Sequence, residues 1–269
     1  MSPLYAVIGG SGFYSLGDDF VEESRHIVQT PYGASSANII RGAWQSQPVV
    51  FLARHGESHR IPPHQINYQA NLYALKQQGV THVIAVNAVG GISPNYGPNT
   101  IALPDQIIDY SWGRAHSFYD AHSVVSDNDD IQHIDFTYPY SASLRAMIVE
   151  SGNEANLKFQ SSGVYGCTNG PRLETKAEII KMSRDGCDMI GMTGMPEASL
   201  AREIGIEYAS IALVVNWCAG INEPENNGQQ NDCSENANSK ITMEKIMQTL
   251  EQGLQPVKQL ILSTLKRMN

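Results

Sequence analysis

The chain has 269 residues, of which 42% are hydrophobic and 17% are charged, and its formal net charge is −9. This composition supports a sizeable buried core and excludes an intrinsically disordered chain. The acidic balance without a basic tract argues against nucleic-acid binding, and the lack of a long apolar run or a basic, apolar leader predicts no membrane span and no export signal.

Short apolar runs predict buried strands, and each run ends in glycine or polar residues. The first run, residues 5–8, leads into the glycine-rich turn Gly9-Gly10-Ser11-Gly12. Such a turn brings backbone N–H groups close to a ligand, often a phosphate, although a plain tight turn explains it equally well. The turn is not a Walker A loop, and Ser15 stands where the dinucleotide fingerprint has its third glycine.

The second predicted strand, residues 48–53, ends in Arg54, His55 and Gly56. Arg54 carries a planar fork of donors that suits an oxyanion, and His55 adds one more donor. His55, His59 and His64 also suggest metal ligands, but Gly56 replaces the glutamate of the zincin motif and prolines 62 and 63 oppose a helix there. We therefore expect no metal site.

Helices and strands alternate along the rest of the chain. Further helices are predicted at residues 67–78, 175–184, 196–204 and 241–268, and further strands at residues 81–86, 101–109, 162–172 and 187–193. Residues 112–140 form a long polar and aromatic excursion, and residues 222–239 a polar loop. The alternation predicts one α/β domain over residues 1–269, with a mostly parallel or mixed central sheet flanked by helices.

The longest buried run, residues 208–215, stops at Asn216, which Trp217 and Cys218 follow. In open α/β sheets, ligands bind beyond the carboxyl ends of the strands, so Asn216 is placed to recognise the edge of a flat ligand. The alternative is an asparagine that only starts a turn.

The four cysteines, Cys167, Cys187, Cys218 and Cys233, form no CxxC pair and no dense framework. Isolated cysteines of this kind are typical of reduced thiols in a cytoplasmic protein. A nucleophilic role for Cys167 or Cys218 needs a nearby base, and no histidine follows His133. We expect structural thiols and a cytoplasmic location.

Several predicted strand ends together resemble one family. Ile8-Gly-Gly-Ser-Gly12, Phe51-Leu-Ala-Arg-His-Gly56, Asn169-Gly-Pro-Arg172, Asp188-Met-Ile-Gly-Met-Thr193 and Pro196-Glu197 resemble the trimeric purine nucleoside phosphorylases, most closely the branch that handles 5′-methylthio nucleosides. The likeness covers almost the whole chain. It implies a phosphorylase-like fold, a homotrimer, and a pentosyl transfer in which a purine nucleoside and phosphate give a purine and a ribose 1-phosphate.

The resemblance also implies a role for individual positions. Phosphate would be bound by Ser11, Arg54, His55, Asn87, Ala88 and Thr193. The nucleoside would be bound by Met192 at the ribose and by Asn216, Trp217 and Cys218 at the base. Leu173 would be a further substrate contact, and the 5′ pocket would be lined by Ile241, Met243, Ile246 and Met247. A neighbouring subunit would lend His133.

The chemistry agrees with these roles. Cleavage builds positive charge on the ribose while the purine leaves as an anion, and a phosphate dianion near C1′ stabilises that charge before it attacks. Asn216 and His55 are the expected catalytic residues. Phosphate is a co-substrate, and we expect no cofactor or metal.

The expected substrate depends on Asn216 and on the 5′ pocket. In the family that the chain resembles, the members that bind adenine have aspartates at the positions of Asn216 and Cys218. The 6-oxopurine phosphorylases have asparagine at the position of Asn216. An amide can donate to N7 and O6 of a 6-oxopurine, although it can also pair with adenine. Phosphorylases of inosine and guanosine direct a late histidine to the 5′-hydroxyl, and this chain has Met243, Ile246 and Met247 instead.

We therefore expect phosphorolysis of S-methyl-5′-thioinosine in purine salvage, with hypoxanthine and 5-methylthioribose 1-phosphate as products. The alternatives are a phosphorylase of inosine and guanosine or of methylthioadenosine. A hydrolytic nucleosidase fits poorly with the expected anion site, and a non-catalytic nucleoside-binding protein is the least favoured reading.

Overall fold

A mixed sheet forms the centre of the computed structural model, which describes residues 3–119, 131, 133–221 and 241–268. Within these ranges the sheet has ten strands. They are β1 (Tyr5–Gly9), β2 (Phe20–His26), β5 (Ile39–Trp44), β6 (Gln47–Ala53), β7 (His82–Gly91), β8 (Ile101–Ala102), β9 (Gln106–Asp109), β10 (Val164–Cys167), β11 (Met189–Gly191) and β12 (Glu207–Trp217). A small separate ribbon pairs β3 (Gln29–Thr30) with β4 (Gly33–Ala34).

The strand β7 joins the two halves of the sheet. It runs parallel to β1 and β12 and antiparallel to β11. On one side β6 lies parallel to β1, and β5 and β2 extend that edge antiparallel. On the other side β10 lies parallel to both β11 and β9, and β8 pairs antiparallel with β12.

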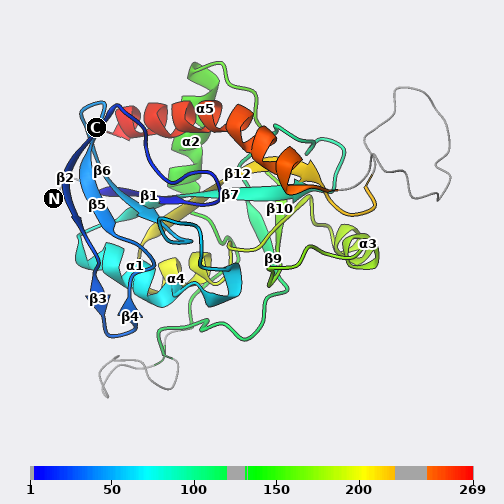
Figure 1. Ribbon diagram of the computed structural model, residues 1–269, viewed down its shortest axis with the longest axis horizontal. Coiled ribbons are helices and arrows are strands. Elements are labelled where there is room, and N and C mark those ends of the chain that lie inside the picture. The colour runs from blue at the N-terminus through cyan, green and yellow to red at the C-terminus, as the bar shows by residue number, and fades with distance from the viewer. Residues whose placement is uncertain (1–2, 120–130, 132, 222–240, 269) are drawn as a thin grey trace.

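Helices cover both faces of the sheet. The helices α2 (Ala142–Glu154) and α5 (Met243–Met268) lie on one face, and α1 (Tyr68–Gln77) and α4 (Glu197–Glu203) on the other (Figure 1). The helix α3 (Lys176–Arg184) lies apart from them, and a 3₁₀ turn spans Pro63–Gln65. The predicted α/β class, with a mixed central sheet flanked by helices, is confirmed.

The strand β12 is buried from Tyr208 to Val215, with α4 and α5 packed against it. A register shift between Val214 and Asn216 interrupts its pairing with β7, and the strand then continues through Trp217. Asn216 therefore lies inside the end of a strand, at a bulge, and does not start a turn. Bulges of this kind re-aim a side chain, and they are common next to binding sites.

The predicted helices form with the expected end signals. Asn67 caps α1 by accepting a hydrogen bond from the Ala70 N–H at 3.0 Å, and Gly79 beyond its end has a φ of 81°. Thr175 and Glu178 form a capping box at the start of α3. Such caps satisfy N–H groups that lack partners within the helix.

Three parts of the fold differ from the sequence-based expectation. The strands β2 to β5 occupy a region in which no element was predicted, and β2 is an edge strand whose residues are largely exposed, so it has no apolar pattern. The helix α2 was also missed, and β7 extends beyond residue 86 to Gly91. The predicted loop at residues 222–239 lies outside the described residues.

Candidate active site

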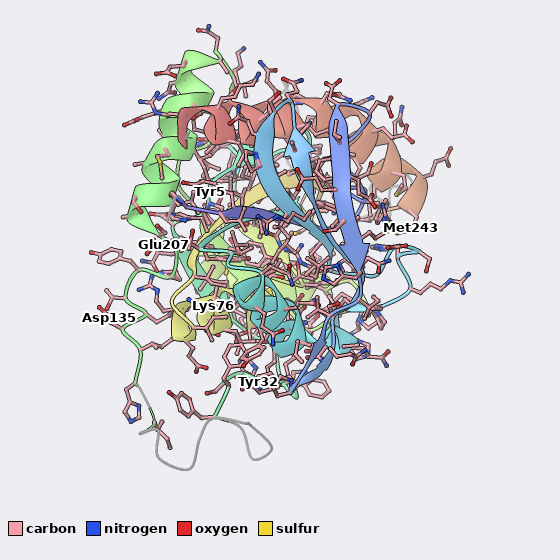
Figure 2. All side chains as sticks on the ribbon, turned by 90° about the vertical axis from the view of Figure 1, so that its left-hand side faces the viewer. Tyr5, Tyr32, Lys76, Asp135, Glu207 and Met243 are labelled. Carbon is pink, nitrogen blue, oxygen red and sulfur yellow. The ribbon has the colours of Figure 1, made fainter. Side chains whose placement is uncertain are left out.

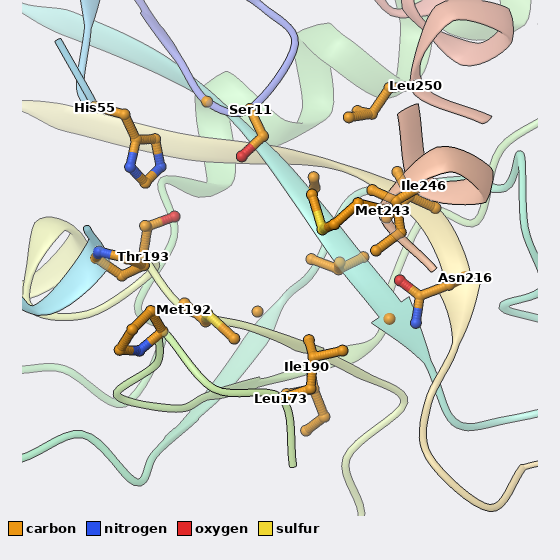
Figure 3. A pocket seen from close by; sticks show the side chains of 18 of the residues that line it. Ser11, His55, Leu173, Ile190, Met192, Thr193, Asn216, Met243, Ile246 and Leu250 are labelled. Carbon is orange, nitrogen blue, oxygen red and sulfur yellow. The ribbon is translucent and has the colours of Figure 1, made fainter. Parts of the chain in front are cut away.

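The ends of β1, β6, β7, β11 and β12 and the first turns of α5 enclose a cavity of about 410 Å³. Its size is in the range of small-molecule sites. Figure 3 shows Ser11, His55 and Thr193 gathered at one end of the cavity and Asn216 at the other. The structure therefore joins the expected phosphate end and the expected base end in one space.

A buried ion pair lies at the phosphate end. Arg54 Nε and Nη2 donate to the two carboxylate oxygens of Glu197 at 2.9 and 2.7 Å, and Nη1 donates to the Val86 carbonyl at 2.7 Å. Both side chains are almost wholly buried, and the Tyr208 hydroxyl also donates to Glu197. Burial alone would lower the pKa of Arg54, but the Glu197 carboxylate raises it above its ordinary value, so Arg54 stays charged.

Arg54 lines the cavity as expected, but much of its donor fork is already committed to the protein. Its charge is matched by Glu197, so it offers a ligand its remaining N–H groups and little net charge. Gly10 makes this packing possible, because a Cβ there would lie 2.5 Å from the Val86 oxygen and 3.0 Å from Arg54 Nη1. The glycine-rich turn therefore serves close packing against Arg54.

His55 also lines the cavity and is buried. Its Nδ1 lies 2.9 Å from the Ile61 carbonyl, which can only accept, so Nδ1 carries a proton and Nε2 is left for a ligand. Burial, together with the nearby Arg54 charge, lowers the pKa of His55 to about 4. Neutral His55 therefore presents an acceptor at Nε2, where the sequence suggested a donor, and this acceptor suits the P–OH group of monohydrogen phosphate.

Three polar side chains form a buried chain behind the phosphate end. Ser210 Oγ donates to Asn87 Oδ1, and Asn87 Nδ2 donates to Thr193 Oγ1, each at 2.8 Å. Because Thr193 accepts from Asn87, its own O–H is free to donate into the cavity that it lines. The structure thus places Ser11, Ala88 and Thr193 at the cavity and Asn87 behind Thr193, outside the lining residues.

At the base end, Asn216 and Cys218 line the cavity, but Trp217 does not. Its ring packs on Gly97 instead, 2.9 Å from the position of a Cβ there. Asn216 Nδ2 donates to the Trp217 carbonyl at 2.7 Å, which leaves one N–H and the amide oxygen for a ligand.

Glu174 is a cavity residue that sequence reasoning missed. It is half-buried, and its Oε1 accepts a hydrogen bond from Thr168 Oγ1 at 2.6 Å, which leaves Oε2 for a ligand. It follows the Asn169-Gly-Pro-Arg172 segment directly after Leu173. The available signal for a ligand contact was an acidic residue beyond a strand end. An acidic residue is equally common at the start of a helix, and the predicted helix begins at Thr175.

Apolar side chains form much of the remaining lining, to which Tyr14, His59 and Arg60 also belong. Met243, Ile246 and Leu250 reach in from α5 (Figure 3). Among the expected nucleoside contacts, the cavity is lined by Leu173, Met192, Ile241, Met243, Ile246 and Met247. Met243 is 68% exposed and lies at the periphery of the molecule (Figure 2), so it marks the mouth of the cavity.

Three other expectations concern His133, a metal site and a membrane span. His133 is exposed and does not line the cavity of its own chain, and the expectation that it serves a neighbouring subunit stays a prediction. Among the described residues, no group of three or more His, Cys, Asp or Glu side chains is arranged to hold a metal ion. In the same ranges, no helix is both long and apolar enough to span a bilayer.

The described cysteines are buried, unpaired thiols. Burial raises the pKa of Cys167 to about 12, and burial together with the Glu174 carboxylate raises the pKa of Cys218. A thiolate is the reactive form of cysteine, so these thiols are poor nucleophiles at neutral pH. Cys233 lies outside the described residues.

Comparison with known proteins finds one family throughout. Residues 4–250 match the model of the phosphorylase superfamily. Over 255 residues the chain is 47% identical to a probable S-methyl-5′-thioinosine phosphorylase of Pseudomonas syringae pv. tomato, with 95% of each chain covered. It is 37% identical to the 6-oxopurine nucleoside phosphorylase of Pyrococcus furiosus, over 98% of this chain and 92% of the relative.

Solved structures show the same fold. The methylthioadenosine phosphorylase from Schistosoma mansoni in complex with adenine superposes with a TM-score of 0.86 at 27% identity. The match covers 98% of this chain and 91% of the other. The likeness therefore spans the whole sheet and the cavity at its edge.

The pKa of His55 predicts a dependence of stability on pH. Its folded-state pKa of about 4 lies below the ordinary 6.5, so between these values the unfolded chain binds a proton that the folded chain does not. The stability that neutral His55 contributes is complete above this window and falls as the pH drops through it, by roughly 2 kcal/mol between about pH 7 and pH 5.

Urea unfolding of the wild type and of His55→Gln at both pH values and at one protein concentration measures this effect. The glutamine amide can still donate to the Ile61 carbonyl but does not titrate. We expect the wild type to lose more stability than the variant on acidification. An equal loss in the two proteins would contradict the assignment of a buried, neutral His55.

Proposed function

The chain belongs to the phosphorylase superfamily, and on that premise we propose that it catalyses the phosphorolysis of S-methyl-5′-thioinosine. The products are hypoxanthine and 5-methylthioribose 1-phosphate, so the enzyme is a pentosyltransferase of purine salvage. Phosphate is its co-substrate. The choice of base rests on Glu174 and Asn216, which both line the cavity, and Glu174 is close enough to Cys218, two residues beyond Asn216, to add to the rise that burial causes in the pKa of that thiol.

The two side chains together match a 6-oxopurine. Its N1 carries a proton, and its N7 and O6 are acceptors, whereas adenine has an acceptor at N1 and a donor at its 6-amino group. The Glu174 carboxylate, which can only accept, pairs with a protonated N1 but faces the N1 lone pair of adenine. The free N–H of Asn216 pairs with N7 or O6. Asn216 alone accommodates either base, and Glu174 removes that ambiguity.

The phosphate end supplies donors for an anion and one acceptor. The hydroxyls of Ser11 and Thr193 and the remaining N–H groups of Arg54 donate, while His55 Nε2 accepts from the P–OH of monohydrogen phosphate. These oriented dipoles place the negative oxygens where they face C1′ of a bound nucleoside, and they stabilise the positive charge that develops there. As the bond breaks, the Asn216 N–H stabilises the negative charge on the purine.

The apolar lining supports a methylthio group at the 5′ position. Met243, Ile246 and Met247 offer no partner for a hydroxyl, and burying one methyl group among them contributes on the order of 1 kcal/mol. The name of the relative from P. syringae supports the same substrate. The 6-oxopurine phosphorylase of P. furiosus supports the base and makes inosine the principal alternative.

We further propose a cytoplasmic homotrimer. Leu173, Met243 and Met247 line the cavity and are nonetheless more than a third exposed, which favours an assembly that covers its mouth. The exposed His133 is available to a neighbouring subunit in such an assembly. Free buried thiols fit a reducing compartment.

The proposed activity is tested with methylthioinosine, methylthioadenosine, inosine, guanosine and adenosine, each with and without phosphate. We expect methylthioinosine to have the highest kcat/KM, with turnover that requires phosphate and releases a ribose 1-phosphate. Full turnover in phosphate-free buffer would identify a hydrolase instead. Inosine or methylthioadenosine as the best substrate would contradict the reading of the 5′ pocket or of the base end, respectively.

A single substitution tests the base contact. Glu174→Gln keeps the size of the side chain, but its amide N–H can donate to N1 of adenine. We expect the kcat/KM ratio of methylthioinosine to methylthioadenosine to fall by about tenfold or more, since an unpaired buried polar group is what discriminates between such ligands. The matched control is Glu244→Gln on the exposed surface of α5, which should leave the ratio unchanged. An equal ratio in Glu174→Gln and the wild type would remove Glu174 from the base site.

A further inference from the structure

Arg114 lies outside the cavity lining but contacts two of the segments that build the cavity. It is half-buried in the segment between β9 and α2. Its Nη2 donates to the carbonyl oxygens of Thr168, Asn169 and Met192 at 3.2, 2.9 and 2.8 Å. Its Nη1 donates to the Met195 carbonyl, and its Nε donates to Asn169 Oδ1 at 3.2 Å.

These carbonyls belong to the segments that follow β10 and β11. The segment after β11 carries Met192 and Thr193, and Arg114 bonds the Met192 carbonyl directly. The segment after β10 begins at Thr168, whose carbonyl accepts from Arg114 and whose hydroxyl donates to Glu174. One guanidinium is therefore connected to Thr193, a proposed phosphate contact, through the preceding residue Met192. It is connected to Glu174, a proposed base contact, through Thr168.

We propose that Arg114 is a positioning residue for phosphorolysis, which fixes the separation between the phosphate end and the base end of the cavity. The inference rests on the proposed function, because it assigns the ends of the cavity to phosphate and purine. Attack at C1′ requires both groups to be held at the correct distance, and a displacement of about 1 Å costs on the order of a hundredfold in rate. A guanidinium suits this task because its donors are fixed in one plane.

If Arg114 only stabilised the fold, its loss should affect activity no more than the loss of Arg145. Arg145 therefore provides a matched control. Arg145 is also half-buried and donates to three carbonyl oxygens, those of Leu103, Pro104 and Ser161, at 3.2, 3.1 and 2.6 Å, whereas Arg114 donates to four. None of these three residues lines the cavity. Loss of Arg145 removes three contacts with backbone carbonyls and loss of Arg114 removes four, but of the two arginines only Arg114 contacts the segments that carry cavity residues.

The test compares Arg114→Ala and Arg145→Ala in the full chain, with kcat and both KM values measured at a temperature where circular dichroism shows each variant folded. We expect Arg114→Ala to lose about ten- to hundredfold in kcat/KM and to raise the KM for phosphate, while Arg145→Ala stays within about threefold of the wild type. Added methylguanidinium should restore part of the activity of Arg114→Ala only. If Arg114→Ala does not fold, Arg114→Lys replaces it, with a smaller loss expected because fewer donors are lost.

Wild-type kinetic constants in the folded Arg114 variant, or an equal loss in Arg145→Ala, would overturn the positioning role. A failure to respond to methylguanidinium at concentrations that leave the wild type unaffected would also count against it. The proposed function fails separately, because a wild-type enzyme without phosphate-dependent turnover refutes the phosphorylase itself. A phosphate-dependent wild type with an unaffected Arg114→Ala refutes only the role of Arg114.

Discussion

The buried pair of Arg54 and Glu197 holds together the elements that form the cavity. Arg54 follows β6, Glu197 begins α4, Tyr208 on β12 donates to the carboxylate, and the Val86 carbonyl on β7 accepts from the guanidinium. Removing one partner would leave an uncompensated buried charge, which costs about 3–5 kcal/mol. Neither residue is therefore free to vary alone, and the glycine at position 10 follows from the space that Arg54 occupies.

This pair also determines how the phosphate end works. Because Glu197 matches the charge of Arg54, and because His55 is neutral at physiological pH, these two side chains present oriented dipoles to the cavity, and Arg60 adds a cation to its lining. The proposed binding of phosphate depends on preorganised hydroxyl and N–H groups, and the buried Ser210–Asn87–Thr193 chain shows one way in which they are held. Arg114 donates to the carbonyl of Met192, the residue before Thr193, and in its proposed positioning role provides a second support.

The sequence predicted the fold class and most elements because the buried strands are short apolar runs with clear end signals. It missed β2 and α2, since an exposed edge strand and a weakly amphipathic helix have no strong pattern. Ser11, His55 and Asn216 lie at one cavity because β1, β6 and β12 run parallel and end at the same edge of the sheet. Thr193 reaches the same cavity from β11, which runs antiparallel to the carboxyl end of β7. Trp217 points elsewhere because alternate residues of a strand face opposite sides. Glu174 and Arg114 were missed because their roles depend on contacts between segments far apart in the sequence.

In the proposed function, the cavity recognises a 6-oxopurine through the carboxylate of Glu174 and the amide of Asn216. The most direct measurement is isothermal titration calorimetry of the wild-type protein with hypoxanthine and with adenine in the presence of phosphate. These two bases differ only in the groups at N1 and C6, so the comparison isolates the base contacts from the ribose and the 5′ pocket. We expect hypoxanthine to bind at least about tenfold more tightly than adenine. Equal affinities, or tighter binding of adenine, would contradict it.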